Sequence, residues 1–202
     1  MKRTLLAIVG LALALAPRVV GAGETPAASA PPPDEKAMME KWSKFATPGP
    51  GHQALQPLVG TWSAKITTWM APGTAPAISE GVSENRWILG GRYLEQKYEG
   101  KVMGQTVSGL GYTAYDNFRK QYLGAWMDTM GTSILTMSGS ADPSGKIVSM
   151  DGKMDDLFTG KPATIQSKLR IVDEDHNAWE MWAPAPDGKV FKTMEIEYTR
   201  RK

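Results

Sequence analysis

The sequence contains no cysteine among its 202 residues and only two histidines. The first absence excludes disulfide bonds, thiol catalysis, cysteinyl metal sites and a lipid-modified cysteine behind a leader peptide. The scarcity of histidine, with no G-x-S-x-G or H-E-x-x-H pattern, removes the usual parts of hydrolase and zinc chemistry. Stability must therefore come from a packed core, and we expect no metal site and no bound cofactor.

Long apolar runs are also scarce, since the only one extends from Leu5 to Ala16 behind Lys2 and Arg3. It is too short to span a bilayer, which requires about 20 apolar residues, but it has the form of a secretory signal. We place cleavage after Ala22, so that residues 1–22 are a signal peptide. The expected product is a bacterial periplasmic or secreted protein without an integral membrane segment.

The mature chain lacks a cluster of basic residues. Removing Lys2, Arg3 and Arg18 with the leader, and no acidic residue, lowers the formal net charge from +2 to −1. Nucleic acids and anionic membrane surfaces require a concentration of Lys and Arg that this chain does not offer. We therefore exclude nucleic acid as a partner, while the oligomeric state stays open.

Beyond the leader, the composition divides the chain into a tether and one domain. Residues 23–33 are rich in Pro and Ala and carry no bulky apolar side chain, which is typical of a disordered linker. Residues 34–59 are expected to form an N-terminal helix, capped by Asp34, and a short helical turn. One apolar stripe recurs at helical spacing in this helix and consists of Met38, Trp42 and Phe45. We expect this stripe to pack against a β-barrel domain, residues 60–202.

Short strand-like runs separated by turn signals fill the domain from Gly60 onward. Their expected cores are 61–70, 78–89, 92–99, 106–115, 121–128, 132–140, 147–154, 164–172, 178–183 and 190–200. The connections are mostly hairpin-sized and leave no room for a crossover helix. We therefore predict an all-β fold, a ten-stranded antiparallel up-and-down barrel, because closure removes the exposed sheet edges.

The first strand begins with Gly60, Thr61 and Trp62, the G-x-W form found in lipocalin-like barrels. In those barrels the indole plugs the closed end, and an arginine from the end of the chain packs across it. Arg200 is the matching candidate, with Arg201 second. Closure brings the first and last strands together, and a guanidinium can stack on an indole while it donates to nearby carbonyls.

Six short segments together resemble one known family. They are TPGPGH (47–52), LVGTW (58–62), LGGRYL (89–94), YDN (115–117), W-x-D (126–128) and DGK (187–189) with the following MEIEYTR (194–200). From about Met38 to Lys202 the chain resembles the bacterial family catalogued as domain of unknown function 1579. The resemblance implies a lipocalin-like (calycin) barrel and names no activity. Ala114 departs from the pattern, where glycine is expected before Tyr115.

The predicted strands are rich in tryptophan and methionine, which either fill the barrel or line a cavity for an apolar guest. A ten-stranded barrel is wide enough that its side chains need not fill it. Residues two apart in a strand share one face, and polar residues on the inner face would orient such a ligand. The candidates are Glu84, Arg86, Tyr122, Trp126 and Asp128. Outward cross-strand pairs have the same appearance in sequence, so the parity of the second strand stays open.

The two histidines fall at predicted turns. His52 lies in the PGPGH turn, where its ring is expected to bond backbone at the closed end, and His176 lies at a polar hairpin tip. A haem ligand must point into an apolar cavity, so both positions disfavour haem.

Three hypotheses follow. The favoured one is a binding module for a small apolar or amphipathic molecule. The second is an enzyme that uses Asp128, Glu84 or Tyr122 as acid or base, which an isolated cavity carboxylate with a raised pKa would support. The third is an interaction protein of the cell envelope, which a filled interior would support.

Overall fold

The computed structural model describes residues 34–155 and 160–202. The predicted signal peptide, residues 1–22, and linker, residues 23–33, lie outside the described residues. The elements follow in the order α1 (Glu35–Ala46), α2 (Pro50–Gln53), η1 (Gln56–Leu58), β1 (Gly60–Thr68), β2 (Ala77–Ile88), β3 (Tyr93–Val102), β4 (Gln105–Asp116), β5 (Gln121–Asp128), β6 (Leu135–Ala141), β7 (Ile147–Asp155), β8 (Pro162–Ile171), β9 (His176–Pro184) and β10 (Val190–Arg200).

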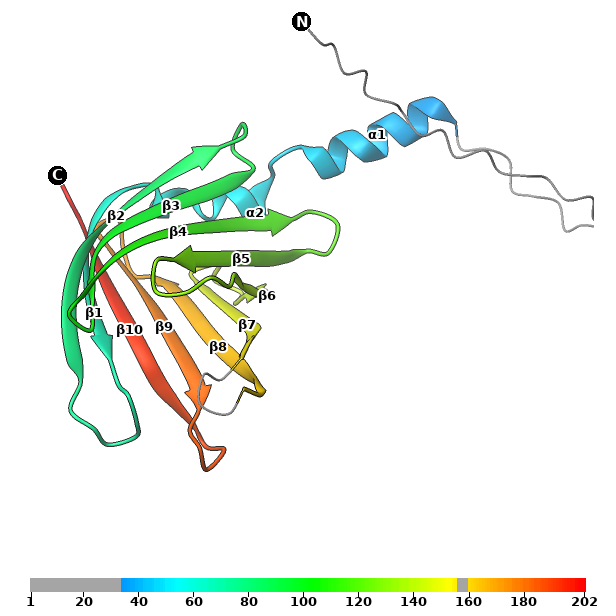
Figure 1. The fold of residues 1–202 in the computed structure, drawn as a ribbon. Coiled ribbons are helices and arrows are strands. Elements are labelled where there is room, and N and C mark those ends of the chain that lie inside the picture. Colours follow the sequence, from blue (N-terminus) through cyan, green and yellow to red (C-terminus); the bar gives the residue numbers. More distant parts are fainter. Residues whose placement is uncertain (1–33, 156–159) are drawn as a thin grey trace, which may run out of the picture. The chain divides into compact units, whose positions relative to one another are not determined.

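The ten strands form one closed antiparallel barrel in which each strand pairs with its neighbours in the chain, and β10 pairs with β1 (Figure 1). The closing register runs from Trp62 opposite Arg200 to Thr68 opposite Met194. This confirms the predicted all-β, ten-stranded up-and-down barrel. The alternation of β1 explains its two faces: Trp62, Ala64 and Ile66 are buried, while the intervening Ser63 and Lys65 are exposed.

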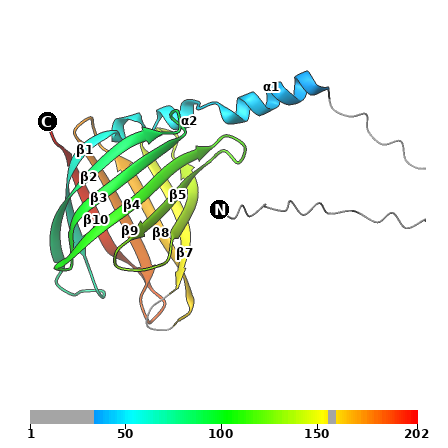
Figure 2. The same cartoon turned by 45° about the horizontal axis from the view of Figure 1, so that its top comes forward.

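The two ends of the barrel differ. At one end, which we call the closed end, α2 and η1 precede β1, and their Leu55 and Leu58 are buried in the core. The hairpins that connect β1 to β2, β3 to β4, β5 to β6 and β9 to β10 lie at the opposite end, which we call the open end. Figure 2 shows α2 at the upper end and hairpins at the lower end.

The buried core consists of two clusters. The first includes the plug residues Leu55 and Leu58 and the inner faces of the strands from β5 to β8. The second surrounds Trp62 on the inner faces of β1, β3, β4 and β10. Trp179 of β9 packs against both clusters. The interior is thus organised around two packed regions that meet at β9.

Helix α1 is present where a helix is predicted, but its apolar stripe is not covered. None of its residues is buried, and the side chain of Trp42 is 69% exposed. Its C-terminal end is tied to the β4–β5 connection, where Asn117 Nδ2 donates to the carbonyl of Phe45 at 3.0 Å, and the rings of Phe45 and Phe118 meet edge-on. The expectation that the whole stripe packs against the barrel is therefore wrong: Phe45 meets Phe118, but Met38 and Trp42 stay exposed.

Candidate functional site

Trp62 and Arg200 meet at the closed end. Trp62 is fully buried, and its Nε1 donates to the carbonyl of Leu58 at 2.9 Å. The guanidinium carbon of Arg200 lies 4.1 Å from the centre of the indole ring. The three nitrogens of this guanidinium also donate to carbonyls of Pro57, Val59 and Glu174 at 2.7 to 2.8 Å. The second candidate, Arg201, instead donates to Ser63 Oγ on the outer face.

Three aromatic side chains, those of His52, Tyr115 and Tyr122, also meet at the closed end. His52 is buried in α2, and its Nδ1 accepts a hydrogen bond from the backbone of Gly49 at 3.1 Å. Burial, and then the positive charge of Arg92, lower the pKa of His52. Tyr115 lies edge-on to both His52 and Tyr122. Burial, and then Tyr115, raise the pKa of Tyr122, so this phenol stays neutral in the floor of the barrel.

Strand β5 places three of the predicted site residues on its inner face. Tyr122, Trp126 and Asp128 lie opposite Tyr115, Gly111 and Gly109 of β4, respectively. The indole of Trp126 lies against the two glycines, because a Cβ at Gly109 would approach the ring to 2.3 Å and one at Gly111 to 2.9 Å. No larger residue fits opposite the indole without displacing it.

Asp128 holds the same indole from its other side. Its Oδ2 accepts from Trp126 Nε1 at 2.7 Å, and its Oδ1 accepts from the backbone of Met130 at 2.8 Å. Both carboxylate oxygens are therefore engaged, one in fixing the indole and one in shaping the turn that follows β5. A charged hydrogen bond of this kind restricts the indole to one orientation.

Apolar side chains between the two core clusters remain partly accessible. They face inward by register, since Ile196 lies opposite Trp179 and Met194 opposite Met181. The partly exposed members are Trp126, Trp179, Met181, Met194 and Ile196. An interior that packs to native density would bury these residues fully. The barrel thus contains accessible apolar surface on the inner faces of β5, β9 and β10.

A polar strip crosses the inner wall near the same region. Gln96 Nε2 donates to Ser83 Oγ at 2.7 Å and approaches the hydroxyl of Tyr198 at 3.3 Å. Ser83 Oγ in turn donates to Asn85 Oδ1 at 3.0 Å. Burial raises the pKa of Tyr198 to about 12. Asn177, opposite Tyr198, has a buried Nδ2 without a hydrogen-bond partner.

Sequence reasoning missed Ser83, Gln96 and Asn177 as interior residues. Their inner placement depends on register, which pairs Ser83 with Trp62 and Asn177 with Tyr198. The sequence does indicate that Tyr198 faces inward, because it continues the apolar face of the last strand. Residues paired with Tyr198 and Trp62 in the neighbouring strands must face inward as well. Aligning those strands with the first and last ones could therefore have identified the missed residues.

Glu84 and Arg86 lie on the outer face of the barrel. Ser83 is buried opposite Trp62, so the next residue, Glu84, points outward and is exposed. Arg86 Nε pairs with Glu95 Oε1 across β2 and β3 at 2.8 Å. The expectation that these two residues line the interior is therefore corrected. Within the described strands, the charged residues at inner-face positions are Asp128 of β5 and Arg200 of β10, and Arg200 is the one that stacks on Trp62 at the closed end.

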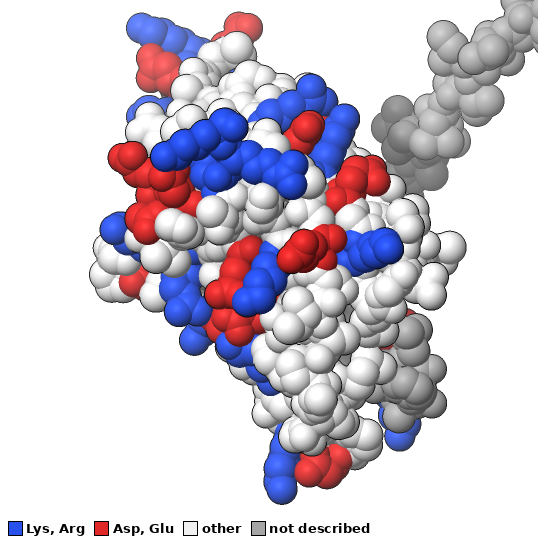
Figure 3. Space-filling view, turned by 90° about the vertical axis from the view of Figure 1, so that its left-hand side faces the viewer, with Lys and Arg blue, Asp and Glu red and all other residues white. Residues whose placement is uncertain are grey.

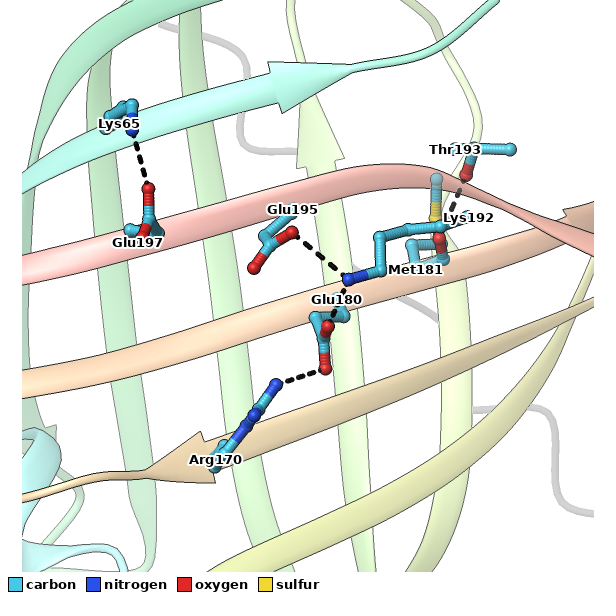
Figure 4. Close-up of polar contacts among 8 residues, drawn as sticks. All are labelled: Lys65, Arg170, Glu180, Met181, Lys192, Thr193, Glu195 and Glu197. Atoms are coloured by element: carbon cyan, nitrogen blue, oxygen red, sulfur yellow. Dashed lines mark hydrogen bonds and ion pairs between the residues drawn. The ribbon is translucent and has the colours of Figure 1, made fainter. Parts of the chain in front are cut away.

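A network of charges lies on the outer wall instead. Glu180 of β9 bonds Arg170 of β8 at 2.5 Å and also bonds Lys192 of β10, which reaches Glu195 at 3.1 Å (Figure 4). Burial opposes ionisation of Glu180, but the bonds from Lys192 and Arg170 outweigh it and lower its pKa. A separate pair joins Lys65 and Glu197 at 2.8 Å. These contacts tie neighbouring strands together and do not reach the interior.

The described residues contain no group of three or more histidine or acidic side chains that could hold a metal ion. His176 lies at an exposed hairpin, where its Nδ1 is 2.9 Å from Asp173 Oδ1. His52 is bonded within α2, so neither histidine lines the barrel.

Residues 34–155 and 160–202 contain no helix long and apolar enough to cross a membrane.

A family profile and solved structures show what this chain is similar to. The family profile described as "Protein of unknown function (DUF1579)" matches residues 47–200. No curated protein sequence matches this chain. The crystal structure of Rv2717c from M. tuberculosis is 17% identical, with a TM-score of 0.55, and the match covers 77% of this chain and 100% of that one. A designed fluorescence-activating beta barrel is 15% identical, with a TM-score of 0.41, and the match covers 73% of this chain and 97% of that one.

Proposed function

Because the chain belongs to the DUF1579 family, whose description names no activity, we propose a function from the geometry of its own barrel. The protein binds a small apolar or amphipathic molecule in the interior, between the two core clusters. The guest packs against Trp126 and Trp179 and enters from the open end.

The observation that carries this proposal is the partial exposure of the inner-face apolar side chains of β5, β9 and β10. Removing about 500 Å² of combined apolar surface from water contributes about 12 kcal/mol at ~25 cal/mol per Å². An immobilisation cost of about 4 kcal/mol leaves about 8 kcal/mol, which corresponds to a micromolar dissociation constant.

The charges of the inner wall restrict the chemistry of the guest. The charged residues at inner-face positions of the described strands are Asp128 and Arg200, and the guanidinium of Arg200 is already engaged by Trp62 and three backbone carbonyls at the closed end. Gln96 and the unpartnered Nδ2 of Asn177 supply uncharged polar contacts. A desolvated anion without a cationic partner is strongly disfavoured. The guest is therefore a neutral molecule, apolar with one or two hydrogen-bonding groups.

The geometry favours binding over acid or base catalysis. Both oxygens of Asp128 accept hydrogen bonds from the protein, so it is not the isolated cavity carboxylate that the enzyme hypothesis requires. Glu84 lies on the outer face, and Tyr122 is buried in the floor with a raised pKa. The solid-barrel alternative requires a filled interior, which the accessible inner side chains argue against.

Native mass spectrometry of protein purified from its own host tests this proposal. We expect one molecule of drug-like size retained per barrel. Ile196→Trp, which fills the space between the clusters, should abolish the adduct, whereas Thr199→Trp on the outer face of the same strand should retain it. A bare mass for the parent protein and no uptake of any neutral guest would reject the binding function.

We also propose that the protein acts in the periplasm or outside the cell. The support is the basic start and short apolar run of residues 1–22. Intact-mass analysis of the exported fraction should give a chain that begins at Gly23. A cytoplasmic or uncleaved product would reject the location.

A further inference from the structure

The two ends of the barrel differ in charge. Four connections at the open end are fully described, and three of them, residues 69–76, 103–104 and 129–134, contain no charged residue. All four strand connections at the closed end contain at least one, including Arg92, Lys120 and the acidic run from Asp173. On the face that Figure 3 shows, most charged side chains lie over the upper and middle parts, and the lower part is mostly uncharged except for groups of both signs at the lowest point and a basic group at the lower right.

Large apolar side chains project from the uncharged connections. Met70 and Ile134 are 66% and 58% exposed, and Met103 and Met130 are exposed as well. Three more exposed apolar residues lie near the open ends of the adjoining strands, namely Ile78, Met154 and Val190. We call these seven residues the apolar rim. Scattered exposed apolar residues are ordinary on soluble proteins, but a set gathered at one end of the molecule marks an interaction site.

We propose that the apolar rim docks onto the surface of an uncharged or zwitterionic lipid bilayer, with the open end of the barrel facing the lipid. The rim complements such a surface because it offers apolar contact, and the exposed charges near it, Asp155, Lys161, Asp187 and Lys189, are of both signs in equal number. It is also continuous with the opening through which the proposed guest enters. The inference extends the proposed function by naming a membrane as the source of the guest, and it rests on that function for this point alone.

The shape of the rim favours lipid over a protein partner. The side chains come from three separate hairpins and from the ends of β2, β7 and β10, so they are spread over the whole end of the barrel and are not contributed by one element. A fluid interface admits separated apolar tips, because each tip can bury its side chain independently. A flat second copy of this end would leave the opening between the two rims and bury less apolar surface.

Co-sedimentation of the full mature chain with phosphatidylcholine vesicles tests the docking. We expect binding that is unchanged between 0.1 and 1 M salt, because the contacts are apolar. The double variant Met70→Glu/Ile134→Glu should weaken partitioning at least about tenfold. Adding an anionic phospholipid to the vesicles should not strengthen it.

Two matched variants control for added charge and for the other exposed apolar element. Leu89→Glu/Val172→Glu adds the same charge at exposed positions of the closed end, and Trp42→Glu alters the stripe of α1. Both should bind vesicles as the parent protein does, with melting temperatures confirming the fold. The proposal is overturned if the parent does not sediment with vesicles, if either control weakens binding as much as the rim variant, or if the rim variant abolishes a dimer in light scattering while vesicles bind nothing. Guest binding without vesicles is measured separately, so failure of docking and failure of the binding function are distinguishable.

Discussion

At the scale of single residues, Trp62 and Arg200 form the best-defined contact of the closed end. G-x-W and a C-terminal arginine are visible in the sequence, and barrel closure requires the first and last strands to be neighbours. Their pairing therefore follows from two local patterns and one topological rule. Asn177 and Gln96 carry no such pattern, because a polar residue in a strand reveals its face only after the register is known.

We expect Trp62→Ala to lower the free energy of unfolding by about 3 to 5 kcal/mol, as loss of a buried indole does. Arg200→Ala should lower it by about 1 to 3 kcal/mol, because several carbonyls lose their donor. Chemical denaturation of the double variant should give less than the sum, since the two side chains touch. Arg201→Ala is the control: its guanidinium bonds Ser63 on the outer face, so its effect should add to that of Trp62→Ala. Full additivity for Arg200 would exclude the stacking contribution.

Tyr198 makes stability depend on pH in the alkaline range. Its pKa is raised to about 12 by burial, whereas a tyrosine in the unfolded chain ionises near pH 10. Above pH 10 the unfolded state loses a proton that the folded state keeps, so the free energy of unfolding falls as the pH rises towards about 12, by about 3 kcal/mol in total. Denaturation curves between pH 9 and 12 measure this slope.

Tyr198→Phe should make that alkaline slope shallower. Tyr93→Phe removes the same hydroxyl from an exposed residue of β3 and serves as the control. An unchanged slope for Tyr198→Phe would show that this phenol does not control alkaline stability.

At the scale of elements, the ten strands were predictable because turn residues separate short apolar runs, but the two faces of β2 were not. Its apolar residues lie on both faces: Ile78 and Val82 point outward, whereas Trp87 lies inside with Ser79, Gly81 and Ser83. The inner face needs small residues there because Tyr98 crosses it: a Cβ at Gly81 would approach the Tyr98 ring to 2.4 Å. Apolar residues on both faces leave the parity of β2 open in the sequence, and the structure places the candidates Glu84 and Arg86 on the outer face.

For helix α1 the element is predictable from the sequence, but its packing is not. Its helical spacing predicts the element correctly, but amphipathicity alone does not say what covers the apolar stripe. The barrel core is completed by Leu55 and Leu58 of the following segment, so the stripe of α1 is not needed to close it.

Strands β4 and β5 hold Trp126 through glycine, which gives a prediction with an internal control. Gly109→Ala should displace the indole and destabilise the protein by about 1 to 3 kcal/mol, because the new Cβ meets the ring at 2.3 Å. Gly124→Ala, on the inner face of β5, places its Cβ in ordinary contact at 3.6 Å from Met150 and should be tolerated. Thermal denaturation and tryptophan emission distinguish the two, and equal behaviour would contradict the packing of Trp126 against β4.

At the scale of the whole molecule, the width of a ten-stranded barrel decides the function. Sequence composition identified the tryptophans and methionines but could not say whether they fill the interior, because that depends on shear, register and the depth of the plug. The structure gives two packed clusters with accessible apolar surface between them, and a charge-poor inner wall. These features are consistent with our proposal that a neutral guest enters at the end that carries the apolar rim. The opposite end is closed by the plug residues.

Titration with the neutral probe N-phenyl-1-naphthylamine, followed by tryptophan emission and melting temperature, tests the central claim most directly. We expect one probe per barrel at micromolar affinity, a raised melting temperature, and weaker binding of the anionic 1-anilinonaphthalene-8-sulfonate. Trp126→Phe should remove most of the emission change and keep the fold, while Trp182→Phe, on the outer face, should leave the response intact. If saturating neutral probe changes neither tryptophan emission nor the melting temperature, the barrel is solid and the binding function is contradicted.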